Sequence, residues 1–146
     1  MKGKFFGKAR RNKAKRLVRR LWMRRSVYKI LQNRATLAAD TGLHEICGTF
    51  VCREGGEIRL NYLQNRCPEP LSHSMNMFEL EVSVRGARVF GTFHTHPISG
   101  AHPSKTDFNL RNISPFLIIY ADIKDEIAFW DISDPEDAKR YSILVR

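Results

Sequence analysis

The chain has 146 residues and an apolar content of 42%, enough for one domain with a substantial hydrophobic core. No apolar run is long enough for a transmembrane helix, and the basic start of the chain lacks the apolar core of a signal peptide, so the sequence points to the cytoplasm. The three cysteines form no C-x-x-C pair, which gives no support to a zinc knuckle or a thioredoxin-like motif.

Charge divides the chain into two unequal parts. Residues 1–34 carry 14 Lys and Arg and no Asp or Glu, whereas the remaining 11 basic residues face 15 acidic ones and leave residues 35–146 at −4. We therefore predict a basic N-terminal extension at residues 1–25, flexible or helical, followed by a domain at residues 26–146. Such an extension could bind an acidic partner, nucleic acid or an anionic membrane surface.

Helical spacing of apolar residues predicts a helix over residues 16–35. Ser26 could begin a second helix over residues 27–39, which Thr41 and Gly42 would end. Two roles stay open for this region, because its apolar stripe could pack on the domain or take part in an interaction.

The sequence pattern in the middle of the chain predicts β-strands. Residues 46–53 and 57–63 flank a Glu-Gly-Gly turn and predict a β-hairpin. A proline-containing loop at residues 65–74 follows, and then alternating apolar and polar residues predict a strand at 78–84. A turn at Arg85 and Gly86 leads into another strand at residues 88–94.

The last third of the chain predicts the centre of a sheet. Residues 116–121 form an apolar run typical of a central strand, and residues 126–132 would form the next one. A short helical turn at Asp134 and Pro135 would precede a last strand at residues 141–145. Together the elements predict an α/β fold with one mixed β-sheet flanked by helices.

A candidate metal site lies between these strands. His94 and His96 are two apart on a strand, so both imidazoles project from the same face. Pro97 ends the strand, Ser104 is a helix N-cap candidate, and Asp107 falls in the first turn of that helix. Each feature alone has a simpler structural explanation, but two imidazoles and one carboxylate are the ligand set of a catalytic zinc ion.

Glu45 is the candidate general base. It directly precedes the apolar run 46–51, and a carboxylate at the mouth of a buried strand can reach a site in the sheet. Taken by itself, Glu45 is better explained as a solvated loop carboxylate.

In combination, these residues resemble a known signature. Glu45 in E-I-C-G, then H-T-H-P, six residues, and S-K-T-D are similar to the JAMM (MPN+) zinc metalloprotease motif of an upstream Glu and H-x-H-P-x6-S-x-x-D. The resemblance covers most of the chain beyond the basic N-terminus and implies the family's α/β, cytidine-deaminase-like fold. It also implies one Zn²⁺ per chain, bound by His94, His96 and Asp107, with Glu45 as general acid and base and Ser104 stabilising the oxyanion.

The resemblance further implies cleavage of a peptide or isopeptide bond, at the C-terminal tail of a ubiquitin-like or sulfur-carrier protein. The sequence departs from the family between residues 85 and 88, where there is little room for the helix that usually precedes the histidine strand.

Two other functions stay open: a non-catalytic MPN-type scaffold, and a nucleic-acid-binding protein that acts through the basic extension. His102 could line the substrate path and His44 could tune Glu45, although a solvated side chain explains either one.

Overall fold

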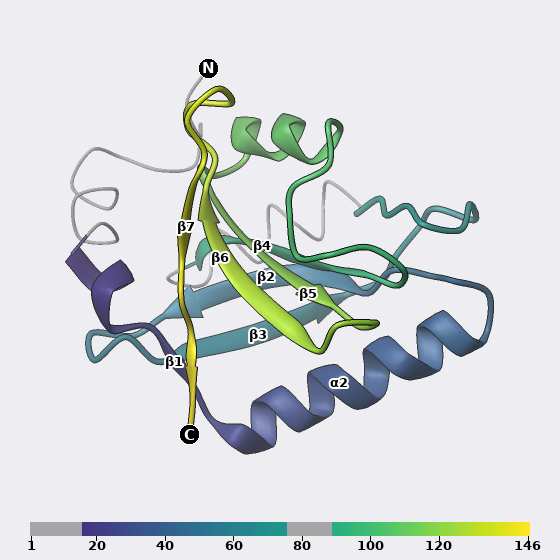
Figure 1. Cartoon of the computed structure of the whole chain (residues 1–146), viewed down its shortest axis with the longest axis horizontal. Helices are drawn as coiled ribbons and strands as arrows, with labels where there is room; N and C mark the ends of the chain where they lie inside the picture. Colours follow the sequence, from purple (N-terminus) through teal and green to yellow (C-terminus); the bar gives the residue numbers. More distant parts are fainter. Residues whose placement is uncertain (1–15, 76–88) are drawn as a thin grey trace.

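A mixed β-sheet with one long helix across it is the frame of the protein, as the computed structural model shows (Figure 1). The structure describes residues 16–75 and 89–146. Within these residues, six strands form one sheet in the order β3-β2-β4-β5-β6-β7. Its strands are β2 (Cys47–Cys52), β3 (Ile58–Leu63), β4 (Val89–His96), β5 (Phe116–Ala121), β6 (Glu126–Asp131) and β7 (Lys139–Tyr141). Within this six-stranded sheet, β4 and β5 are the one parallel pair of neighbours, so the predicted α/β class and mixed sheet are confirmed.

β5 lies at the centre of the sheet and is buried along its whole length. Alternate residues of the strand enter two different cores, because successive side chains point to opposite faces. Phe116, Ile118 and Tyr120 join the cluster that also contains Leu31 of the long helix. Leu117, Ile119 and Ala121 join a second cluster on the other face. A strand covered on both faces needs a continuous apolar run, which is why the sequence predicted a central strand here.

The long helix, α2 (Arg25–Asp40), covers one face of the sheet (Figure 1). It includes the predicted helix at 27–39, but it begins directly after Arg24 rather than at a Ser26 cap. Thr41 and Gly42 follow its last turn, as predicted, and Gly42 takes the positive φ of 147°. The helix docks on the turn between β5 and β6 through Asp125, whose Oδ1 accepts hydrogen bonds from Tyr28, Gln32 and Tyr120.

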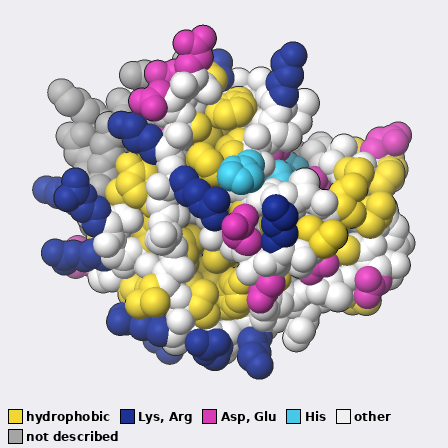
Figure 2. Space-filling model, in the orientation of Figure 1, with side chains coloured by type: hydrophobic (Ala, Val, Ile, Leu, Met, Phe, Trp, Pro, Cys, Tyr) yellow, Lys and Arg dark blue, Asp and Glu magenta, His cyan; other side chains and the backbone are white. Residues whose placement is uncertain are grey.

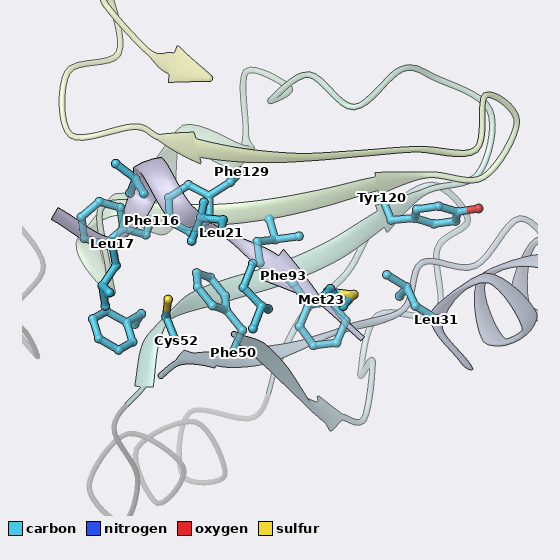
Figure 3. Packing of buried hydrophobic residues seen from close by; sticks show 14 of the residues in the cluster. Leu17, Leu21, Met23, Leu31, Phe50, Cys52, Phe93, Phe116, Tyr120 and Phe129 are labelled. Carbon is cyan, nitrogen blue, oxygen red and sulfur yellow. The ribbon is translucent and has the colours of Figure 1, made fainter. Parts of the chain in front are cut away.

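The segment before α2 belongs to the core. The prediction that residues 1–25 form an extension outside the domain is therefore wrong for residues 16–25. Leu17, Val18, Leu21 and Met23 are all buried, and Figure 3 shows three of them packed with the phenylalanines of the sheet. Instead of one continuous helix, the chain forms a short 3₁₀ helix, η1 (Val18–Arg20), and the strand β1 (Trp22–Met23). β1 pairs in parallel with β8 (Leu144–Val145), which joins the two ends of the described chain.

The other predicted elements divide into three groups. The hairpin of β2 and β3 and the strands β5 and β6 are confirmed. The predicted last strand is instead two short strands, β7 and β8, and residues 134–135 form a bend and turn without a helix. The predicted strand at 78–84, the shortened segment at 85–88 and residues 1–15 lie outside the described residues.

Basic side chains of the N-terminal region lie on the surface of the folded domain, where Arg16, Arg19, Arg20, Arg24 and Arg25 are all exposed. In Figure 2, Lys and Arg gather over the side of the molecule where η1, β1 and the start of α2 lie in Figure 1. The basic character of the N-terminal region is therefore partly carried by residues that are folded into the domain. Within the residues that the structure describes, no helix combines the length and the apolar character that crossing a membrane requires.

Candidate metal centre

His94 and His96 lie at the end of β4, in the middle of the sheet. All eight residues of β4 are buried, and His94 pairs with Cys47 of β2 on one side and Ile119 of β5 on the other. Both imidazoles project toward Asp107 on the face opposite α2. The expectation that the two histidines share one face of a strand is confirmed.

Asp107 is brought to the histidines by the loop that follows β4. The predicted helix at Ser104 is a shorter 3₁₀ helix, η2 (Asp107–Asn112), which begins three residues later. Ser104 still caps the first residue of η2. The Asp107 amide donates to Ser104 Oγ at 3.2 Å, and the Ser104 amide donates to Asp107 Oδ2 at 2.9 Å. This reciprocal pair fixes the carboxylate over the two imidazoles.

The three predicted ligands form a small triangle. His94 Nε2 lies 3.1 Å from His96 Nε2 and 3.0 Å from Asp107 Oδ2, and His96 Nε2 lies 3.2 Å from the same oxygen. In tetrahedral coordination, zinc bonds of about 2.0–2.1 Å separate neighbouring ligand atoms by about 3.3–3.4 Å. The triangle needs only a slight expansion to accept such an ion.

The chemistry of the donors also fits a metal ion. His96 Nδ1 lies 2.9 Å from the Gly100 carbonyl, which can only accept, so Nδ1 carries a proton, and release of the proton that Nε2 donates to Asp107 would leave a lone pair there for a metal ion. That lone pair faces a second imidazole nitrogen and a carboxylate, with all three residues buried. A cation is the group that such a set of converging donors would hold.

Burial and hydrogen bonding set the protonation of the cluster. Burial lowers the pKa of His94 and favours the neutral imidazole that a metal requires. Burial alone would raise the pKa of Asp107, but the hydrogen bonds from His94 and His96 outweigh it and hold that pKa well below its usual range. Asp107 is therefore ionised at neutral pH, as a metal ligand would have to be.

Glu45 reaches the same site from the start of β2. It is buried, with 6% of its surface exposed, so the solvated-loop explanation is wrong. Its Oε1 lies 2.8 Å from His73 Nδ1, and the ring of His73 stacks on that of His94 with centroids 4.4 Å apart. His73 was not predicted as part of the site, because it lies in a loop more than twenty residues before the histidine pair and belongs to no recognisable spacing.

Glu45, His73, His96, Ser104 and Asp107 line one open pocket of about 570 Å³, while His94 is fully buried beside them. Ser104 is exposed at its wall, while His44 and His102 are not among the lining residues. His102 instead packs near Trp130, with ring centroids 5.7 Å apart. The rim has exposed apolar side chains on two sides, with Leu71 at 43% and Ile98 at 53% exposure.

The fold and the site define a metal-binding class of α/β domain, in which two histidines and one aspartate meet beside a buried glutamate. The model of the prokaryotic homologs of the JAB domain matches residues 29–133, and the chain belongs to this family. Membership confirms the resemblance drawn from Glu45 and the H-T-H-P and S-K-T-D segments. A search among curated proteins found no match.

Solved structures share the fold. Protein DSY2949 from Desulfitobacterium hafniense superposes with a TM-score of 0.69 at 22% identity, over 86% of this chain and 92% of that one. A structure described as a JAMM metalloprotease-like zinc site in the proteasome and signalosome gives 0.56 at 18% identity, over 86% and 97%. AF2198, a JAB1/MPN domain protein from Archaeoglobus fulgidus, gives 0.55 at 17% identity, over 86% and 98%. At these levels of sequence identity, the three comparisons show a shared fold and nothing about function.

Proposed function

We propose that this protein is a zinc-dependent metallopeptidase that hydrolyses a peptide or isopeptide bond. The observation that carries the proposal is that the three-ligand triangle, the buried Glu45 and Ser104 meet at one open pocket, which all of them line except the fully buried His94. Zinc bound by His94, His96 and Asp107 would act as a Lewis acid and lower the pKa of a coordinated water to about 7.

Glu45 would move the proton during the reaction. As the oxygen of the attacking water bonds to the substrate carbonyl carbon, the carboxylate accepts a proton from that water. It then delivers the proton to the amine nitrogen as the carbon–nitrogen bond breaks. Glu45 Oε1 is hydrogen-bonded to His73, which would leave the second carboxylate oxygen to accept the proton from the water.

Ser104 would stabilise the negative charge that develops on the carbonyl oxygen. Its Oγ accepts from the Asp107 amide and lies 3.1 Å from Thr106 Oγ1. When the Thr106 hydroxyl donates to Ser104, the Ser104 hydrogen is available to the substrate.

We propose the C-terminal tail of a ubiquitin-like or sulfur-carrier protein as the substrate. The cluster lies below the rim formed by the 71–73 and 97–99 segments, so small residues next to the scissile bond would enter most easily. β4 is hydrogen-bonded on both sides, so it offers no free strand edge to a substrate beside the candidate ligands. The substrate backbone would instead run between these two loop segments, whose apolar residues Leu71 and Ile98 could pack against it.

The test is to incubate the zinc-loaded protein with fusions that carry such tails and with unrelated peptides, using Glu45→Gln as the blank. Cleavage after the terminal Gly of the tails, absent from the blank, would support the proposal. Equal cleavage of unrelated peptides would indicate a general peptidase. Zinc binding without cleavage of any substrate would favour the non-catalytic scaffold.

A further inference from the structure

His73 is the one histidine outside the sequence motif that contacts the centre of the site. Its Nδ1 lies 2.8 Å from Glu45 Oε1, and its ring is stacked 4.4 Å from that of His94 with an interplanar angle of 21°. Only 10% of the His73 side chain is exposed. Its placement therefore links the candidate base to one of the candidate metal ligands.

A second cation site is one explanation for this cluster. Glu45, His73 and His94 each offer a ligand atom, and these atoms lie within 4.8 Å of one another. The ring orientation argues against shared coordination, however. The lone pair of an imidazole nitrogen lies in the plane of its ring, so nearly parallel stacked rings direct their lone pairs side by side instead of toward one ion. The contact with Glu45 is better described as a hydrogen bond in which Nδ1–H of His73 donates to the carboxylate.

The loop that carries His73 is fixed to the strand end that carries Glu45. Asn65 makes this connection, because its Nδ2 donates to the carbonyl of Glu45 at 2.9 Å and to that of Ser72 at 3.0 Å. Its Oδ1 accepts from the amide of Ser74 at 3.1 Å. One side chain thus binds the backbone on both sides of His73 and the backbone of Glu45 itself.

We propose that His73 is a positioning residue that holds the Glu45 carboxylate toward the metal-ligand triangle. Asn65 holds the loop that carries His73 in place beside Glu45. The inference rests on the proposed function of Glu45 as general base. A single hydrogen bond restricts rotation of the carboxylate, and the stacked ring covers one face of His94. His73 acts through Glu45 and need not touch the substrate.

The first test compares His73→Ala with the unchanged full-length protein, both loaded with zinc. Outer partners of a metal site typically contribute about 10–100-fold, so we expect kcat to fall by about that factor while KM stays within about twofold. Zinc content should remain one per chain. His73→Asn, whose side-chain amide can donate from near the Nδ1 position, should recover most of kcat, and His102→Ala is the matched histidine control outside the pocket.

A double-mutant cycle separates positioning from an independent role. In the Glu45→Gln background, removal of His73 should cost nothing further, because the group it positions is already disabled. An equal loss in both backgrounds would overturn the inference, as would full activity of His73→Ala.

An activity-independent readout completes the test. Two-bond ¹H–¹⁵N spectra of the imidazoles in the zinc-loaded protein should show a proton on His73 Nδ1, with a signal that shifts in Glu45→Ala. A bare or metal-bound Nδ1 would overturn the inference. If the wild-type protein cleaves no amide substrate, the proposed function fails, and these spectra still decide whether His73 holds Glu45.

Discussion

Replacement of Asp107 by Asn is the sharpest perturbation of the proposed metal centre. The change keeps the shape of the side chain and an oxygen that can accept from the Ser104 amide, which now donates to Oδ2 at 2.9 Å. It removes the negative charge that faces His94 and His96 at 3.0 and 3.2 Å. A neutral amide is a much poorer zinc ligand than a carboxylate, so the variant should fold and bind zinc weakly.

The size of the effect follows from the linkage between binding and stability. At a zinc concentration of about 100 times Kd, the wild-type protein gains about 2.7 kcal/mol. A chain of this length shifts its Tm by about 2–4 °C per kcal/mol, which predicts a rise of about 5–11 °C. If loss of the carboxylate weakens binding about 100-fold, the same zinc concentration stabilises the variant by only about 0.4 kcal/mol, or about 1–2 °C.

Thermal unfolding with and without zinc, together with elemental analysis of the dialysed protein, measures both quantities. Asp131→Asn is the matched control, because it makes the same isosteric change at a residue that binds Ser133 away from the pocket. The control should keep the full zinc-dependent rise. Stoichiometric zinc and an undiminished rise in Asp107→Asn would refute the ligand assignment.

Three further predictions concern the base, the core and the extension. Glu45→Gln should retain zinc and fold but lose about 10²–10⁴-fold in kcat, and more than about a tenth of wild-type activity in a steady-state assay would require another base. Met23→Ala should lower the free energy of unfolding by about 2–5 kcal/mol in urea titrations, because the side chain is fully buried, whereas Leu37→Ala at 66% exposure should change it by less than about 0.5 kcal/mol. Removal of residues 1–15 should leave a folded domain and abolish a salt-sensitive interaction with an acidic partner. Removal of residues 1–25 should prevent folding, so a well-folded product with native circular dichroism would contradict the place of Met23 in the core.

The sequence predicted those parts of the site whose geometry is local. The period of a strand places His94 and His96 on one face whatever surrounds them. Asp107 follows eleven residues later through a short loop, and its exchange of hydrogen bonds with Ser104 is also local. The central strand at residues 116–121 was predicted because burial on both faces requires a continuous apolar run.

Contacts between distant segments were the ones that sequence patterns missed. Leu17 and Leu21 fit the stripe of a helix, but β1 pairs with β8, and Trp22 lies opposite Leu144. Nothing local distinguishes a helical stripe from a buried extended segment when the partner is more than a hundred residues away. His73 was missed for the same reason, because a loop histidine shows its role only when the loop is fixed beside Glu45.

Thr95, the residue between the two histidines, connects the backbone of the candidate ligands to that of the candidate base. Thr95 donates its amide hydrogen to the carbonyl of Ile46 at 2.9 Å, and its Oγ1 accepts from the amide of Ile46 at 2.9 Å. Ile46 directly follows Glu45, so this pair of bonds connects the ligand strand to the residue next to the base. Because β4 is fixed on its other side by β5, Glu45 cannot shift along the sheet without breaking both bonds to Thr95. The middle position of H-T-H thus fixes the backbone of Glu45, while His73 orients its carboxylate, and the two supports act on different parts of the same residue.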